Sequence, residues 1–107
     1  MKDSTALKSL AALSQANRLR TFRALVAAGP AGMTPTAIAR LLKVQPATLS
    51  FHLKELATAG QITQQREGRN LIYRADYAHM SRLLAYLTRN CCQGPRPAPS
   101  ATDSCAG

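Results

Sequence analysis

Three cysteines carry the most reactive side chains of this sequence. Cys91 and Cys92 are adjacent, and Cys105 follows them in the last fifth of the 107-residue chain. No apolar pattern there indicates a core that a disulfide could stabilise, and an odd number of cysteines in a reducing compartment indicates free thiols. Thiolates can bind soft ions or be oxidised, so this cluster is a candidate site for either chemistry.

The second chemical feature is a strong excess of positive charge. Fourteen Lys and Arg residues against five Asp and Glu residues give a formal net charge of +9. This imbalance indicates a polyanionic partner, with nucleic acid ahead of an anionic membrane. No apolar run approaches the roughly 20 residues of a spanning helix, and the first residues do not resemble a secretory signal. We therefore expect a cytoplasmic protein with no membrane partner.

The elements that must position these residues begin with two helices of a single domain. Residues 4–13 are predicted to be helical, with Asp3 or Ser4 as the N-cap. The apolar residues of its face are Leu7, Leu10, Ala11 and Leu13. Ser14 is expected to cap a second helix that ends at Gly29.

Two short helices joined by a tight turn are predicted next. Thr34 and Pro35 suit the cap and the first turn of one helix, and Pro46 suits the first position of the other, which runs to Gly60. The side chains expected to point inward from the first are Ile38, Ala39, Leu41 and Leu42. This arrangement is typical of a helix-turn-helix motif.

A change of pattern after Gly60 predicts a β-hairpin, and then a last helix. Residues 61–66 and 71–74 resemble strands and flank a turn that contains Gly68. Asp76 is expected to cap the last helix, whose apolar seam comprises Tyr77, Met80, Leu84 and Leu87. This seam is too apolar to remain in water, so the first helix or a second subunit should cover it.

Three stretches carry a likeness to a known family. They are LSQANRLR at residues 13–20, ATLSFHLKEL at residues 47–56, and REGRN at residues 66–70. Together with the helix order, they resemble the ArsR/SmtB family of winged helix-turn-helix repressors over about residues 5–90. The resemblance implies a symmetric dimer, a recognition helix in the major groove of DNA, and release of DNA when a metal or metalloid binds.

The expected fold class is therefore mainly α with a β-hairpin. It is a winged helix-turn-helix whose first and last helices form a dimer interface. We assign residues 1–92 to the DNA-binding and dimerisation domain, and residues 93–107, rich in Pro, Gly and Ser, to a flexible tail that carries one thiolate ligand.

The candidate DNA-binding residues lie on the recognition helix and the wing. Gln45 and Ser50 can read bases, whereas Thr48 and Lys54 suit phosphates. The complete set is Gln45, Ala47, Thr48, Ser50, His52, Lys54, Arg66 and Arg69. The alternative for the helix is a merely solvated polar face, and His52 is equally well explained as a structural hydrogen-bonding group. The wing arginines could also discourage strand aggregation.

Two metal-binding arrangements of the family are absent from this sequence. Members that bind thiophilic metals through the first helix of the motif need cysteines in residues 36–42, and there are none. The zinc arrangement of the last helix has only its aspartate, Asp76, because Ala78, Arg89 and Cys92 stand where further ligands are needed. We accordingly expect His79 to be a surface or interface residue.

The cysteines resemble those of family members that sense arsenite with a cysteine pair and a third cysteine downstream. Trivalent arsenic is soft and binds three thiolates, whereas tetrahedral zinc needs a fourth ligand. Cys91 and Cys92 can share one ion only if the helix ends there, because adjacent helical residues point about 100° apart.

The function expected from the sequence is that of a homodimeric repressor. It binds double-stranded operator DNA and leaves it when As(III), or by the same chemistry Sb(III), binds Cys91, Cys92 and Cys105; no organic cofactor is expected. The alternatives are a thiol-redox-responsive repressor and, from a different class, a thiol-dependent reductase.

Overall fold

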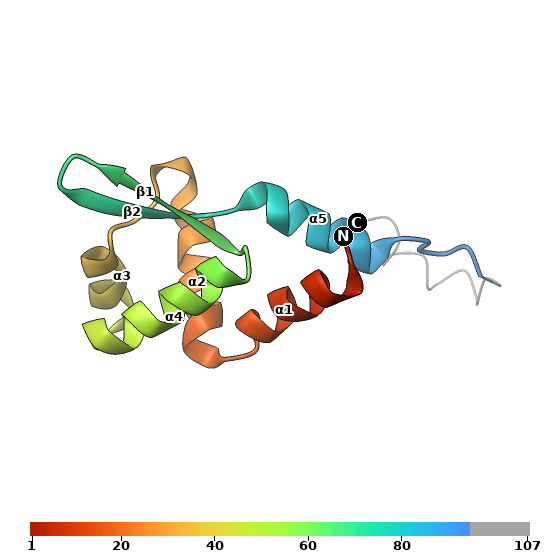
Figure 1. The fold of residues 1–107 in the computed structure, drawn as a ribbon, viewed down its shortest axis with the longest axis horizontal. Helices are drawn as coiled ribbons and strands as arrows, with labels where there is room; N and C mark the ends of the chain where they lie inside the picture. The colour runs from red at the N-terminus through yellow and green to blue at the C-terminus, as the bar shows by residue number, and fades with distance from the viewer. Residues whose placement is uncertain (95–107) are drawn as a thin grey trace.

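The computed structural model describes residues 1–94, and within them the chain forms a winged helix-turn-helix (Figure 1). The elements are α1 (Asp3–Leu13), α2 (Ala16–Ala28), the 3-10 turn η1 (Gly29–Ala31), α3 (Pro35–Leu42), α4 (Pro46–Thr58), β1 (Ile62–Glu67), β2 (Asn70–Ala75) and α5 (Tyr77–Thr88). The expected fold class, mainly α with one hairpin, is confirmed.

Local capping signals explain where α3, α4 and α5 begin. The Thr34 hydroxyl oxygen accepts a hydrogen bond from the Ala37 N–H at 3.2 Å, and the Asp76 carboxylate accepts one from the His79 N–H at 2.9 Å. Pro46 occupies the first position of α4, where a missing N–H costs nothing. These three boundaries agree with the sequence-based predictions.

The predicted caps of the first two helices are wrong. Neither Asp3 nor Ser4 caps α1, which begins at Asp3 after Lys2 without a side-chain cap. Gln15, not Ser14, caps α2, because its side-chain oxygen accepts the Arg18 N–H at 2.9 Å. The Ser14 hydroxyl instead donates to the Ala11 carbonyl at 2.7 Å and so belongs to the end of α1.

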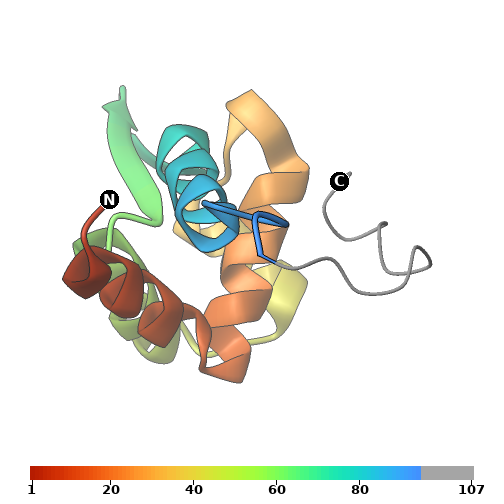
Figure 2. The ribbon, with the colours of Figure 1, turned by 90° about the vertical axis from the view of Figure 1, so that its right-hand side faces the viewer.

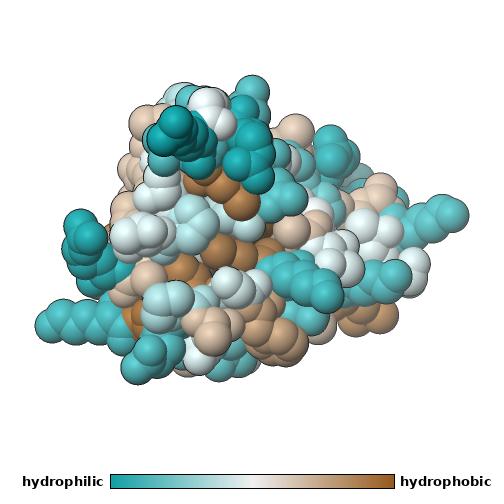
Figure 3. Space-filling model, turned by 60° about the vertical axis from the view of Figure 1, so that its left-hand side comes forward, coloured by the Kyte–Doolittle hydropathy of each residue, from teal (hydrophilic) through white to brown (hydrophobic). Residues whose placement is uncertain are grey.

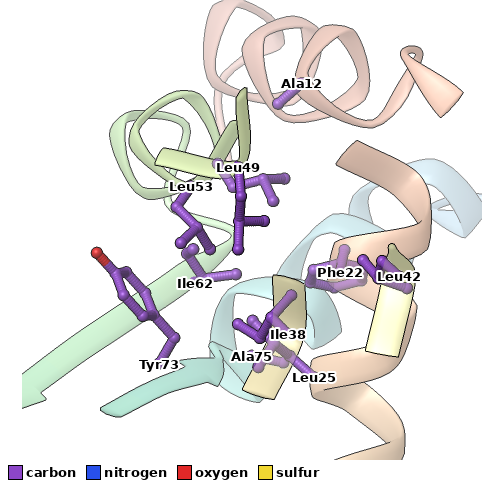
Figure 4. Close-up of a cluster of buried hydrophobic side chains, with 11 residues drawn as sticks. Ala12, Phe22, Leu25, Ile38, Leu42, Leu49, Leu53, Ile62, Tyr73 and Ala75 are labelled. Atoms are coloured by element: carbon purple, nitrogen blue, oxygen red, sulfur yellow. The ribbon is translucent and has the colours of Figure 1, made fainter. Parts of the chain in front are cut away.

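One apolar core holds the helices and the base of the hairpin together (Figure 4). Leu25, Ile38 and Leu56 are fully buried in it, and the hydroxyl of Tyr73 points away from the other side chains of the cluster. The prediction that Leu41 points inward is wrong, since this residue is 59% exposed. Leu42, the next residue, is buried in the core as predicted.

The fold has two distinct ends. The hairpin loop, α3 and the start of α4 lie at one end, and α1 with α5 lies at the other, which Figure 2 views directly. α1 buries Ala6, Ser9 and Ala12 and leaves Leu7 65% exposed. No helix within residues 1–94 has the length and apolar character needed to cross a membrane.

The apolar seam predicted for the last helix is divided between the core and the surface. Tyr77 and Met80 are partly buried against the core, and the Tyr77 hydroxyl donates to the Val26 carbonyl at 3.2 Å. Leu84 and Leu87 remain exposed at the same end of the molecule as Leu7. The subunit's own helices therefore cover only half of this seam.

Candidate DNA-binding interface and cysteine pair

A tight turn connects α3 to α4. Lys43 adopts a left-handed conformation (φ 56°) after the last residue of α3, and Gln45 then forms the extended N-cap of α4. α4 packs its buried residues, which are Leu49, His52, Leu53 and Leu56, against the core. The opposite side of the helix therefore faces solvent along most of its length.

Most of the predicted recognition residues are accessible on that side. Ser50 and Lys54 are exposed along the length of α4. Gln45, Ala47 and Thr48 are exposed at its N-terminal end, which is the end that approaches base edges when such a helix enters the major groove. Their individual contacts with DNA stay predictions.

His52 is the exception, and its predicted contact with DNA is wrong for this structure. Its side chain is only 6% exposed, on the buried side of α4, where it cannot reach a phosphate. Burial, and then the positive charge of Arg18, lower the pKa of His52 below the ordinary 6.5. The ring is therefore a neutral interior group, in line with the structural alternative.

Sequence reasoning missed Phe51, a large apolar residue on the outward side of α4. Its side chain is 56% exposed. Helical spacing places it four residues after Ala47 and three before Lys54, on the same stripe of the helix. That spacing was a signal available in the sequence.

The wing presents its two arginines at an exposed tip. β1 and β2 pair antiparallel as far as Glu67 and Asn70, and Gly68 (φ 65°) supplies the left-handed turn between them. Arg66 and Arg69 are both exposed. Their phosphate contacts remain predictions, but the hairpin places both cations where a DNA backbone could lie.

Arg74, on the second strand of the wing, connects that strand to the first strand and to η1. Its guanidinium forms an ion pair with Glu67 at 2.7 Å and donates to the Gln65 side-chain oxygen at 2.9 Å. It also donates to the Pro30 carbonyl at 2.7 Å, which ties the hairpin to η1. Arg74 is thus occupied within the subunit.

A groove of about 310 Å³ separates α4 from the wing. Leu53, Leu71 and Tyr73 contribute apolar lining, and Ser50 and Lys54 contribute polar groups. Figure 3 shows apolar side chains in a hollow bordered by hydrophilic ones. Two of the predicted recognition residues, Ser50 and Lys54, therefore border one groove with the wing.

The cysteine pair lies just beyond the end of α5. α5 ends at Thr88, whose carbonyl accepts the Cys91 N–H at 2.9 Å, and Asn90 and Cys92 adopt left-handed conformations. The Sγ atoms of Cys91 and Cys92 consequently lie 3.2 Å apart. The helix thus ends where sharing of one ion requires it to end.

The predicted third ligand, Cys105, lies outside the described residues, together with the rest of residues 95–107. Residues 1–94 alone contain no group of three or more His, Cys, Asp and Glu side chains arranged to hold a metal ion.

A buried polar cluster connects α1 and α5 to the end of α4. His79 is only 7% exposed, and its Nε2 lies 2.7 Å from the hydroxyl of the fully buried Ser9. The Gln61 amide donates to the Ser9 carbonyl at 2.9 Å, and a side chain at Gly60 would meet the His79 ring at 3.0 Å. The expectation of a surface or interface His79 is therefore wrong.

Comparison with known proteins agrees with this geometry. Residues 13–65 match a family described as a helix-turn-helix domain. A search of curated proteins finds no match. Among solved structures, an ArsR-like transcriptional regulator from Rhodococcus sp. RHA1 is 26% identical with a TM-score of 0.75, over 84% of this chain and 82% of that one.

Two further structures extend the likeness. A possible transcriptional regulator for arsenical resistance is 25% identical with a TM-score of 0.65, over 75% of this chain and 80% of that one. The homodimeric winged helix-turn-helix DNA-binding domain of a possible ArsR-family regulator from Mycobacterium bovis is 26% identical with a TM-score of 0.66, over 82% and 84%. The chain is therefore a winged helix-turn-helix transcriptional regulator that is similar to ArsR-like regulators.

Proposed function

We propose that the protein is an arsenite-responsive transcriptional repressor. As a homodimer it binds an inverted-repeat operator in double-stranded DNA, and it dissociates when As(III) binds Cys91, Cys92 and Cys105. The observation that carries the effector assignment is the 3.2 Å separation of the Cys91 and Cys92 Sγ atoms at the end of α5.

DNA binding is supported by the surface of α4 and the wing. Ser50 and Lys54 are exposed on the helix, and Arg66 and Arg69 are exposed on the hairpin. The formal net charge of +9 favours association with phosphates, which releases condensed counterions. The wing cations fix the position of the duplex, and the helix reads base edges.

Dimerisation is supported by the apolar surface at the opposite end. Leu7, Leu10, Leu84 and Leu87 are exposed on α1 and α5, which is the pattern of a seam that a second copy covers. The similar Mycobacterium bovis domain is itself homodimeric. A symmetric pair would carry two recognition helices, one for each half of the operator.

The donor set suits a trivalent metalloid. As(III) is a soft ion that takes three thiolates, and two sulfurs already lie side by side just beyond the end of α5. Cys105 follows Cys92 by thirteen positions and can supply the third, because the entropy cost of closing a loop grows only slowly with its length. One similar structure is described as a possible regulator for arsenical resistance.

A fluorescence anisotropy titration tests the proposal. The duplex is one that the wild-type protein selects from a randomised library, titrated with and without sodium arsenite. Arsenite should weaken wild-type binding by about 5- to 150-fold, the usual range of allosteric coupling. The single replacements Cys91→Ser, Cys92→Ser and Cys105→Ser should bind DNA normally but lose most of this response.

Two further titrations distinguish the three-cysteine arsenite site from the alternatives. Monomethylarsenite needs only two thiolates, so it should still release Cys105→Ser from DNA. Hydrogen peroxide in place of arsenite tests the redox alternative, and a response to peroxide alone would replace the arsenite proposal. A protein with all three cysteines changed to serine that still dissociates with arsenite would refute the three-cysteine site.

A further inference from the structure

Phe51 is a large apolar residue that the core of the subunit does not bury. It lies midway along α4 with 56% of its surface exposed, between Ala47 and Lys54 on the outward stripe of the helix. A large aromatic side chain in water is unfavourable, whereas the same side chain contributes strongly when an apolar group covers it.

The exposed leucines of the dimer surface do not reach Phe51. Leu7, Leu10, Leu84 and Leu87 belong to α1 and α5, which lie at the other end of the molecule from the start of α4, whereas Phe51 lies midway along α4 on its outward side (Figures 1 and 2). A symmetric dimer through those helices would therefore leave Phe51 accessible. The group that covers it must approach the outward side of α4.

A buried neighbour contacts the aromatic ring of Phe51. The ring centroids of Phe51 and His52 lie 5.7 Å apart with an interplanar angle of 62°, an edge-to-face arrangement. The Phe51 ring therefore contacts a buried neighbour on one side and is exposed over more than half of its surface.

The surroundings of Phe51 indicate DNA as that partner. Lys54 and Ser50 are exposed on the same side of α4, and the wing carries two exposed arginines, so the surroundings of this one apolar side chain are cationic and polar. In the major groove, the C5-methyl group of thymine is the apolar feature among hydrogen-bonding base edges, and phenylalanine is a suitable contact for it.

We propose that Phe51 contacts a thymine methyl group in each half of the operator and thereby determines base specificity at that position. This inference rests on the DNA binding by α4 in the proposed function. It assigns the apolar part of the recognition to Phe51 and leaves hydrogen bonding to bases and phosphates to the polar residues beside it.

Deoxyuridine substitution tests the contact, because it removes the methyl group and leaves base pairing unchanged. In the selected duplex, each thymine is replaced singly by deoxyuridine and the Kd is measured by fluorescence anisotropy. One position in each half-site should weaken wild-type binding by about fourfold, the value of one buried methyl group. Replacing both should weaken binding by about sixteenfold.

Phe51→Ala should bind more weakly and should show no difference between thymine and deoxyuridine at that position. Phe51→Leu, which keeps an apolar contact, should restore part of the difference. The matched control is Leu41→Ala, which truncates a residue with 59% exposure on α3, and it should retain the full deoxyuridine effect. Circular dichroism checks that each variant keeps the wild-type fold.

Three results would overturn the assignment. They are an operator with no deoxyuridine-sensitive position, a sensitive position that stays sensitive in Phe51→Ala, and a Phe51→Ala protein whose oligomeric state has changed, which would make this face a protein interface. Failure of the wild-type protein to select any duplex would instead contradict the proposed DNA binding.

Discussion

The buried pair of Ser9 and His79 gives the most specific prediction about stability. The Ser9 hydroxyl is fully buried, donates to the Thr5 carbonyl at 2.9 Å and lies 2.7 Å from the His79 Nε2. In this arrangement the hydroxyl accepts a hydrogen bond from the Nε2–H. Ser9→Ala removes the acceptor and leaves a buried donor of His79 without its partner.

The expected cost follows from that unpaired group. A buried polar group that loses its partner typically costs about 1–3 kcal/mol, more than the net value of the hydrogen bond itself. The methyl group of alanine fills most of the serine volume, so the cavity contribution is small. We therefore expect the free energy of unfolding to fall by about 1–3 kcal/mol.

Urea unfolding at one fixed protein concentration measures this change, since the proposed dimerisation would make stability concentration-dependent. Ser4→Ala, on an exposed position of the same helix, is the matched control and should change little. In Ser9→Ala with His79→Leu, both polar partners are absent, so the double variant should lose less than the two single losses together. Equal effects at Ser9 and Ser4, or strictly additive losses, would refute the reasoning.

Three other predictions concern binding, assembly and pH. Arg69→Ala should weaken binding to all duplexes and reduce the slope of log K against log salt by about 1, as measured by anisotropy at several salt concentrations; an unchanged slope would exclude a phosphate contact. Leu84→Glu should convert the dimer to a monomer in sedimentation equilibrium at micromolar concentration, whereas a persistent dimer would place the interface elsewhere. Because the pKa of His52 is lowered in the folded protein, protonation favours the unfolded state, so the stability that His52 contributes is complete above pH 6.5 and is lost as the pH falls below it. Urea unfolding between pH 7.5 and 5 should show a smaller loss for His52→Gln than for the wild-type protein, and parallel curves would contradict this.

Local signals in the sequence determined most of the secondary structure. Thr34 and Asp76 can satisfy the first N–H groups of a helix through their own side chains, and Pro46 suits a first turn. Gly68 tolerates the positive φ that the hairpin turn requires. These preferences depend on a few neighbouring residues, so they could be recognised without the fold.

Which side chains are buried was decided only by the tertiary structure. On α4 the polar His52 is buried and the apolar Phe51 is exposed, the opposite of what their hydropathy suggests. Ser9 and His79 can be buried because each supplies a partner to the other, although seventy positions separate them in the sequence. Such pairing has no local signal, because burial depends on which distant elements pack against a helix face and what hydrogen bonds they offer.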